Sequence, residues 1–303
     1  MKSRFALAAL APVLLVGCLV VQMRPRAAGT TPGDADVRAR LDAHVRALAV
    51  PRNDRHPDGL AAAVAYLRAR WPDATADAGD NWTHVLPGGP EILVVGAHYD
   101  SCGDTPGADD NASGVAVMLE VARLLEGRRF PRTVRFVAFA REEPPDFQRP
   151  TMGSLVNAKV ARERGDDVAL MLSIESVGYF SDEPGSQAWP LGLGLFFPST
   201  GNFLNVVGDL GSAGGVRRVA GLLREGSLPI AASAVPAWVP GVDWSDHWSY
   251  WQHGYDAVMI TDMPPFRNPH YHEPSDTPEK LDYERLARFT VALAAAVERL
   301  ASP

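Results

Sequence analysis

Short continuous runs of apolar residues alternate with longer amphipathic segments along most of the chain. Runs of about four to eight apolar residues are typical of strands buried on both faces of a sheet. Such runs occur at 92–97, 134–138, 168–174, 193–197 and 257–260. Helical spacing of apolar residues is found between them, at 112–126, 155–164, 202–224 and 278–300. This alternation predicts a three-layer α/β fold, in which a mixed, mostly parallel central sheet has helices on both faces.

Two further helices are predicted ahead of the first strand. Their apolar residues recur at helical spacing and are Val37, Leu41, Val45 and Leu48, then Leu60, Val64 and Leu67. The segment 24–34 is rich in Pro, Gly and Thr and has no such periodicity, so it is interpreted as a linker. We therefore expect a single folded domain over residues 35–303.

Residues 1–23 have the pattern of a targeting segment, because a basic start is followed by an apolar run over 5–23. Positions 15–18 resemble a bacterial lipobox, in which Cys18 becomes the lipidated N-terminus. A run of about 19 residues is also long enough to span a bilayer uncleaved, and a cleaved signal peptide is the third alternative. All three predict a folded domain outside the cytoplasm: in the bacterial cell envelope or periplasm, anchored by lipid or membrane, or secreted.

Charge and cysteine content exclude other classes of protein. The formal net charge of -7 is spread along the chain without a basic block, so we expect no nucleic-acid partner. Cys18 and Cys102 are the only cysteines, which excludes a disulfide scaffold. We interpret Cys102 as a small buried hydrophobic residue in preference to a reactive thiol. Membrane contact is expected through the N-terminal segment alone, and the domain is expected to be a monomer.

Candidate metal ligands follow the predicted strands, where the loops of an α/β sheet gather ligands. The residues at these strand ends or in nearby loops are His98, Asp100, Asp109, Asp110, Glu142, Glu143, Glu175, Tyr271 and His272. A single histidine or acid pair is usually structural or solvated. Several charges beside buried strands, however, would each cost several kcal/mol unless paired or bound to metal. Nitrogen and carboxylate ligands together favour zinc.

The number of acids indicates more than one ion. Two divalent cations a few ångströms apart repel each other, so a carboxylate must bridge them while others neutralise charge. Each ion would lower the pKa of bound water from about 15.7 towards 7. A further carboxylate must carry the proton from that water to the leaving amine. The adjacent Glu142 and Glu143 can divide the roles of base and ligand.

Four separated motifs resemble the zinc metallopeptidase family that contains bacterial leucyl-type aminopeptidases, glutamate carboxypeptidase and glutaminyl cyclase. They are His98-Tyr99-Asp100-Ser101, PGADDNASG at 106–114, Glu142-Glu143, and Tyr271-His272 with Asp276-Thr277. The motifs occur in the family's order, and 36–300 is compatible with its mixed-sheet, zinc exopeptidase type of fold. The resemblance implies a metal-dependent aminopeptidase that acts on peptides and needs no organic cofactor.

The roles of the metal ligands are implied by this resemblance. Asp110 would bridge two zinc ions, His98 and Glu175 would complete one site, and Glu143 and His272 would complete the other. Glu175 stands where the best-known members have Asp, and its extra methylene lengthens the reach by roughly 1.5 Å. That zinc site is therefore expected to be weak unless the strand end shifts or the denticity changes.

Other roles are implied in the same way. Glu142 would be the general base, Tyr271 would stabilise the oxyanion, and Asp100 would accept the second ring N–H of the histidine ligand. The resemblance also implies a cis bond between Asp109 and Asp110, and a supporting role for the segment 245–247.

Two features bear on specificity and on competing functions. The loop 144–151 is longer than expected and is a candidate part of the substrate pocket, with Phe147 as a wall. On the same fold, glutaminyl cyclisation and carboxypeptidase-type processing are alternatives to aminopeptidase activity. A non-catalytic binding module on the envelope is an alternative of a different class.

Overall fold

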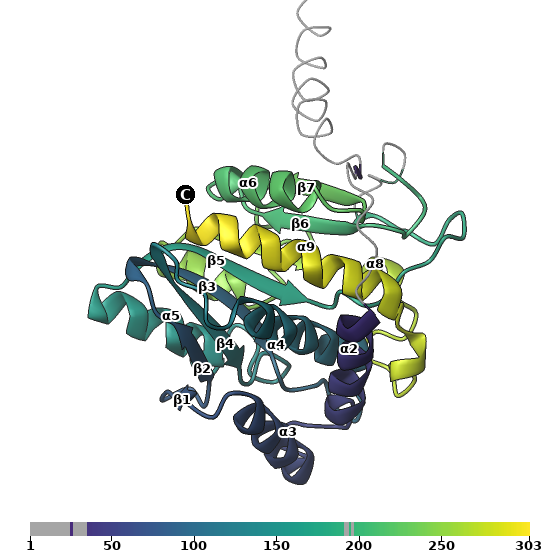
Figure 1. The fold of residues 1–303 in the computed structure, drawn as a ribbon. Coiled ribbons are helices and arrows are strands. Elements are labelled where there is room, and N and C mark those ends of the chain that lie inside the picture. The colour runs from purple at the N-terminus through teal and green to yellow at the C-terminus, as the bar shows by residue number, and fades with distance from the viewer. Residues whose placement is uncertain (1–24, 27–34, 191–193, 195–196) are drawn as a thin grey trace, which may run out of the picture.

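The computed structural model describes residues 25–26, 35–190, 194 and 197–303. Its centre is an eight-stranded sheet with the strand order β1-β2-β4-β3-β5-β8-β6-β7 (Figure 1). The strands are β1 (Thr75–Ala76), β2 (Trp82–Leu86), β3 (Gly89–His98), β4 (Arg132–Phe139), β5 (Asp167–Glu175), β6 (Leu204–Gly208), β7 (Ile230–Ala234) and β8 (Ala257–Thr261). Parallel pairing joins β3 to β4 and β5, β5 to β8, and β6 to β7, whereas β1–β2, β2–β4 and β6–β8 are antiparallel. The predicted mixed, mostly parallel sheet is confirmed.

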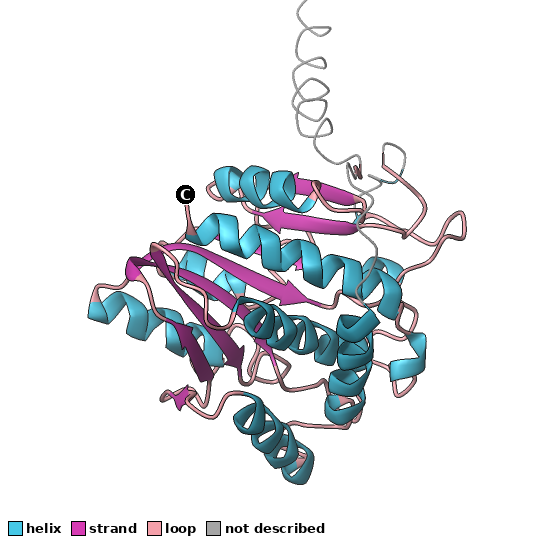
Figure 2. Ribbon diagram, in the orientation of Figure 1, coloured by secondary structure: helices cyan, strands magenta, loops and turns pink. Residues whose placement is uncertain are grey.

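Helices lie on both faces of this sheet (Figure 2). They are α2 (Ala35–Leu48), α3 (Pro57–Arg70), α4 (Gly114–Leu125), α5 (Gly153–Arg164), α6 (Ala213–Leu223), α7 (His247–Gln252), α8 (Pro264–Arg267) and α9 (Tyr283–Ala301), with the short turns η1 (Ala108–Ser113) and η3 (Pro278–Lys280). The two helices predicted ahead of the first strand correspond to α2 and α3.

Alternate residues of β3 face two different helical layers. Leu93, Val95 and Ala97 belong to the larger hydrophobic core, which includes buried residues of α2, α4, α6 and α9. Ile92 and Val94 belong to a second core, which includes residues of α5 and α7. Because successive side chains of a strand point to opposite faces, the two layers lie on opposite sides of the sheet. The predicted three-layer architecture is confirmed.

The four strands β3, β4, β5 and β8 run in the same direction. Their carboxyl ends therefore meet at one edge of the sheet. His98 and Glu175 are the last residues of β3 and β5, and Glu142 follows shortly after β4 ends at Phe139. The topology thus brings residues from three separate parts of the chain to one place.

The prediction of a helix over 202–224 is wrong in its first part. This segment begins with β6 and turns at Asp209, whose carboxylate accepts a hydrogen bond from the Ser212 N–H at 2.8 Å before α6 begins. The apolar residues of β6 are all buried, so its periodicity resembles that of a buried helix. The predicted strand at 193–197 lies largely outside the described residues, and its described positions, Gly194 and Phe197, are not in a strand.

The final helix begins later than the prediction of 278–300. Pro278 starts only the short turn η3, and α9 begins at Tyr283. Its N-cap is Asp282, whose carboxylate accepts a hydrogen bond from the Arg285 N–H at 2.9 Å. This carboxylate supplies the partner that the first turn of a helix needs.

The predicted targeting segment, 1–23, lies outside the described residues, as does the linker apart from Pro25 and Arg26. Arg26 pairs with Ile230 at the start of β7 through hydrogen bonds between their backbones. Within the described ranges, no helix has the length and apolar character needed to cross a membrane.

Candidate metal centre and active site

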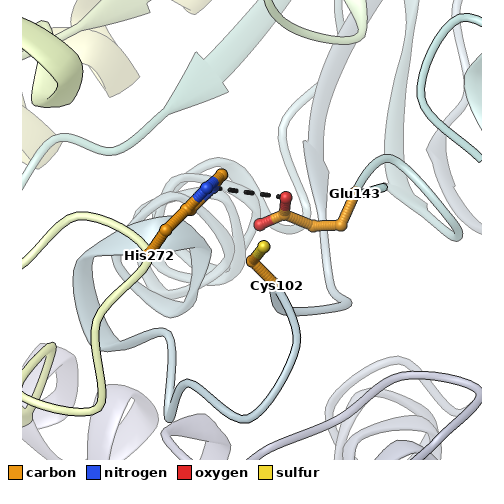
Figure 3. Close-up of side chains that lie close together, drawn as sticks. All are labelled: Cys102, Glu143 and His272. Atoms are coloured by element: carbon orange, nitrogen blue, oxygen red, sulfur yellow. Dashed lines mark ion pairs between the residues drawn. The ribbon is translucent and has the colours of Figure 1, made fainter. Parts of the chain in front are cut away.

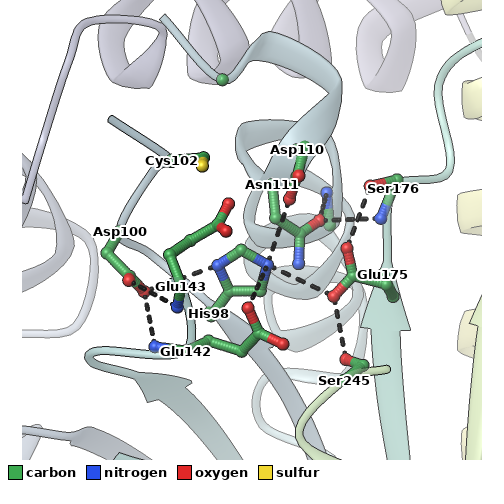
Figure 4. A network of polar contacts seen from close by, with 12 residues as sticks. His98, Asp100, Cys102, Asp110, Asn111, Glu142, Glu143, Glu175, Ser176 and Ser245 are labelled. Carbon is green, nitrogen blue, oxygen red and sulfur yellow. Dashed lines mark hydrogen bonds and ion pairs between the residues drawn. The ribbon is translucent and has the colours of Figure 1, made fainter. Parts of the chain in front are cut away.

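A first cluster of side chains surrounds His98 at the end of β3 (Figure 4). Its Nε2 atom lies 3.3 Å from Asp110 Oδ1 and 3.2 Å from Glu175 Oε2. Asp110 comes from η1 and Glu175 from the end of β5, and all three side chains are buried. An imidazole nitrogen and two carboxylate oxygens therefore converge on one point.

A second cluster shares Asp110 with the first. The Nε2 atom of His272 lies 3.1 Å from Asp110 Oδ2 and 3.4 Å from Glu143 Oε2. The two oxygens of Asp110 thus face different histidines, which is the arrangement expected of a bridging carboxylate. All five predicted metal ligands are brought together, although they span positions 98 to 272 of the chain.

Several buried polar atoms of these clusters lie near opposite charges but make no hydrogen bond, which suits a metal ion. Both ring nitrogens of His98, Nε2 of His272 and Oε1 of Glu143 are buried and make no hydrogen bond with any described residue. Unpaired buried groups of this kind are costly. Nitrogen and carboxylate ligands in this arrangement fit zinc.

The electrostatics of the clusters lead to the same conclusion. Burial raises the pKa of Glu143 to about 7, and the negative charge of Asp110 adds to this shift. Burial also raises the pKa of Glu142 well above its usual range, against the attraction of His98. The protein alone therefore lacks the positive charge that would keep all of these carboxylates ionised, and a divalent cation would supply it.

Glu142 lies beside the first cluster but does not share its short contacts. Its Oε2 atom is 3.8 Å from Nε2 of His98. The two oxygens of Asp100 accept hydrogen bonds from the backbone N–H groups of Glu142, at 3.1 Å, and Glu143, at 3.0 Å. Asp100 therefore fixes the peptide groups of both glutamates.

Asp100 differs from the expected role in one respect. Its Oδ1 atom lies 3.5 Å from Nδ1 of His98, and this contact does not have hydrogen-bond geometry. Asp100 therefore contacts the ring of His98 less closely than it contacts the backbone N–H groups of Glu142 and Glu143. The position of Asp100 behind the ring is nevertheless as predicted.

Two serines hold the longer side chain of Glu175. Ser176 Oγ donates to Glu175 Oε1 at 2.9 Å, and Ser245 Oγ donates to Oε2 at 2.8 Å. Ser245 belongs to the segment 245–247, for which a supporting role was predicted. These hydrogen bonds show how the extra methylene is accommodated, because the carboxylate still reaches His98.

Two acidic residues organise the loop that presents Asp110, and the role of Asp276 was not predicted from the sequence. The carboxylate of Asp276 accepts hydrogen bonds from the backbone N–H groups of Asp109, at 3.0 Å, and Asp110, at 3.2 Å. Asp109 in turn accepts from the Gly178 N–H at 2.9 Å and from Asn268 Nδ2 at 2.8 Å. Asp109 therefore joins three loops around the site.

The backbone is strained at several positions next to the clusters. Arg141, Ser176 and His272 have φ angles of 55°, 46° and 59°, in the left-handed region that residues other than glycine seldom adopt. Each is a site residue or directly adjoins one. Strained conformations of this kind persist where surrounding contacts enforce them, and they are frequent in functional sites.

The cis peptide bond lies one residue later than expected. It joins Asp110 to Asn111, and the predicted cis bond between Asp109 and Asp110 is wrong. Asn111 is fully buried, and its Nδ2 atom donates to the carbonyl of Ile174 at 2.8 Å.

Two cavities adjoin the clusters. The first has a volume of about 330 Å³, includes Glu175 and Tyr271 in its lining, and is otherwise mainly apolar and aromatic, with Trp238 and Trp244 among the lining residues. The second has a volume of about 560 Å³ and is lined in part by Glu143 and by Pro144, Pro145 and Asp146 of the long loop. The loop thus lines a cavity as predicted, but Phe147 does not line either of these two.

The chain has a mixed sheet covered by helices, and its histidines and carboxylates gather at the carboxyl ends of the parallel strands. These two features define the class of metallopeptidase-like α/β proteins. Residues 81–297 match the sequence profile described as "Peptidase family M28". The chain belongs to peptidase family M28.

Two curated relatives illustrate the similarity. The uncharacterized protein YfbL of Escherichia coli (strain K12) is 44% identical over 213 residues, which are 67% of this chain and 65% of YfbL. Leucine aminopeptidase 1 of Trichophyton rubrum is 28% identical over 232 residues, which are 71% of this chain and 56% of that protein. The matched regions therefore span less than two thirds of the length of these relatives.

Solved structures share the fold. The LapA aminopeptidase of Legionella pneumophila superposes with a TM-score of 0.69 at 20% identity, covering 89% of this chain and 72% of LapA. A zinc aminopeptidase of Bacillus subtilis gives a TM-score of 0.55 at 25% identity, covering 74% and 50%. A glutaminyl cyclase of Fimbriiglobus ruber gives 0.60 at 18% identity, covering 90% and 97%.

Proposed function

We propose that this chain is a zinc-dependent aminopeptidase that releases N-terminal residues from peptides. The main support is the position of Asp110, whose two oxygens separately contact His98 and His272. One carboxylate shared between two clusters suits a pair of metal ions. The family of the chain and the aminopeptidases among its relatives support the same reaction.

In this proposal, His98 and Glu175 would hold one zinc ion, His272 and Glu143 would hold the other, and Asp110 would serve both sites. Bound zinc would polarise the scissile carbonyl and supply a nucleophile derived from water at neutral pH. The serines that fix Glu175 and the contacts that fix the Asp110 loop keep the ligands in position before substrate binds. Such preorganisation lowers the cost of reaching the transition state.

Glu142 is the proposed general base and acid. Its carboxylate accepts the proton of the attacking water and delivers it to the amine of the departing peptide. Burial raises the pKa of Glu142, and the positive charge of bound metal would oppose this shift and favour the carboxylate that accepts the proton. Burial also raises the pKa of Tyr271, so its hydroxyl stays protonated and can donate a hydrogen bond to the oxyanion.

The first cavity is the proposed binding site for the side chain of the N-terminal residue. Its lining includes Glu175 and Tyr271, together with Val207 of β6 and Met259 of β8. An apolar lining favours a large apolar side chain over a charged one, because a charge would lose its hydration there without gaining a partner. We therefore expect a preference for leucine-like N-terminal residues.

Replacing Met259 by Trp tests this assignment. The larger ring fills the cavity, so the ratio of kcat/KM for a leucyl anilide to that for an alanyl anilide should fall by about tenfold or more. A loss of folded protein would lower both kcat/KM values equally, so it would not change their ratio. Leu210→Trp, at a side chain that is 58% exposed, is the matched control and should leave the ratio unchanged. An unchanged ratio in Met259→Trp would place the side-chain pocket elsewhere.

The proposed reaction is tested by metal content and product analysis on the purified full chain. We expect two zinc ions per chain, loss of amino-acid release from aminoacyl anilides after chelation, and recovery when zinc is restored. Pyroglutamate formation from a glutaminyl peptide, without release of free amino acids, would replace the proposal with the cyclase alternative. If the zinc-loaded chain formed neither product from a broad substrate panel, the non-catalytic binding module would be favoured.

The location and substrate source are also proposals. The apolar segment 5–23 supports an envelope-anchored or exported enzyme that meets peptides outside the cytoplasm. Labelling of Cys18 with a lipid precursor would distinguish the lipoprotein route, since a signal anchor or an ordinary cleaved signal peptide leaves that cysteine unlabelled.

A further inference from the structure

Cys102 lies next to the second cluster, although the sequence predicted a small buried hydrophobic residue at this position. Its Sγ atom, a carboxylate oxygen of Glu143 and a ring nitrogen of His272 all lie within 4.8 Å of one another (Figure 3). Cys102 follows β3, Glu143 follows β4 and His272 precedes η3, so three separate loops supply the group. Cys102 is a free, partly buried cysteine.

Two buried atoms of the neighbouring residues make no hydrogen bond, which points to a ligand at this place. Glu143 is 4% exposed, and its Oε1 atom makes no hydrogen bond with any described residue. Nε2 of His272 is likewise without a hydrogen-bond partner among the described residues. Two ligands at about 2.1 Å from a tetrahedral zinc ion lie about 3.4 Å apart. The 3.4 Å between His272 Nε2 and Glu143 Oε2 matches this separation.

We propose that the thiolate of Cys102 is an additional ligand of the metal ion held by Glu143 and His272. With Asp110, the second site then has nitrogen, sulfur and two carboxylate oxygens as donors, whereas the first has only nitrogen and oxygen. On binding, the thiol releases its proton to solvent and the sulfur forms the bond to the metal. This inference rests on the proposed function and adds a ligand to one of its two sites.

The loop that holds Cys102 is fixed by its own hydrogen bonds. The carbonyl of Cys102 accepts from Thr105 Oγ1 at 2.7 Å and from the Thr105 N–H at 3.0 Å. Asn53 Nδ2 donates to the carbonyls of Ser101, at 2.7 Å, and Gly103, at 2.6 Å, on either side of the cysteine. A sulfur on a fixed turn loses little conformational freedom when it binds a metal, which favours its action as a ligand.

The thiolate makes the two metal sites chemically different. Sulfur is a soft ligand that favours zinc and cobalt over magnesium and manganese, which prefer oxygen. The second site should therefore discriminate against magnesium and manganese more strongly than the first. This difference also offers a spectroscopic signature, because a bond between thiolate and Co²⁺ absorbs in the near ultraviolet by charge transfer.

The test is titration of the metal-free full chain with Co²⁺, followed by absorption spectroscopy and metal analysis. We expect a charge-transfer band in the unchanged protein, and its loss in both Cys102→Ser and Cys102→Ala, with the visible bands of bound Co²⁺ retained. Metal affinity at one of the two sites should fall by at least about tenfold, since even residues that only support a ligand contribute that much.

Cys18 provides the matched control, because the chain has only two cysteines. Cys18→Ala should retain the charge-transfer band. The role of Cys102 would be overturned if the unchanged protein showed visible Co²⁺ bands but no charge-transfer band. It would also be overturned if the charge-transfer band survived in Cys102→Ser. Either result would leave the proposed function standing. Failure to bind any Co²⁺ would overturn both.

Discussion

Replacing Glu142 by Gln is expected to lower kcat/KM for N-terminal cleavage by about 10² to 10⁴ while the zinc content stays unchanged. The amide has nearly the same shape as the carboxylate but cannot accept the proton of the attacking water. Glu142 lies beside His98 without a contact as short as those of the proposed ligands, since its Oε2 atom is 3.8 Å from Nε2. Steady-state kinetics and metal analysis of the same preparation measure both quantities.

Two neighbouring acids serve as controls for this substitution. Glu143→Gln should lose metal as well as activity, because Glu143 contacts His272 at 3.4 Å in the second cluster. Asp146→Asn changes a partly buried acid of the same loop and should leave both nearly unchanged, because the amide oxygen can still accept the hydrogen bond from Thr151 Oγ1. Full activity in Glu142→Gln would assign the proton transfer to another group, and loss of zinc in that variant would make Glu142 a ligand.

The central part of the fold could be predicted because its signals are local. A strand buried on both faces is apolar at every position, and the runs at 92–97, 134–138 and 168–174 correspond to the centres of β3, β4 and β5. The same property explains why β6 was wrongly predicted as part of a helix. Its five buried residues adjoin the amphipathic α6, and a short apolar run beside a helix cannot be distinguished from a further helical turn by periodicity alone.

The outer strands gave weaker signals for a different reason. The buried positions of β2 are few, since only Leu86 of its five residues is fully buried. A strand of this kind depends on its antiparallel pairing with β4, which no local pattern reveals. Tertiary pairing therefore decides its structure, and the sequence alone cannot supply it.

Much of the candidate site could be predicted because parallel strands end at a common edge. Residues that can ligate a metal and that follow β3, β4 and β5 must therefore lie near one another, whatever the details of the loops. The hydrogen bonds that join distant loops around the site are harder to predict from the sequence. Asp276 binds the backbone of Asp109 across a separation of 167 residues, and an aspartate that accepts hydrogen bonds from a distant loop has no local signature.

Arg52 illustrates this limit most clearly. It is fully buried in the segment after α2, and its guanidinium donates hydrogen bonds to several backbone carbonyls, including those of Tyr99 at 2.7 Å and Gly107 at 2.9 Å. Burial lowers the pKa of Arg52 to about 10, so it remains charged at neutral pH. A buried cation thus joins the loop after His98 to the loop before Asp110.

Replacing Arg52 by Met is therefore expected to lower the free energy of unfolding by about 3 to 5 kcal/mol, because buried carbonyls lose their donors. Arg52→Lys should recover only part of this loss, since an ammonium group cannot reach both loops with the fixed fork of a guanidinium. Urea denaturation at a fixed zinc concentration measures the change, because bound metal adds its own stabilisation. Arg55→Met, whose side chain is 68% exposed, should stay within about 0.5 kcal/mol of the unchanged protein. Equal stabilities of the Arg52 and Arg55 variants would show that the two loops are held in place without this guanidinium.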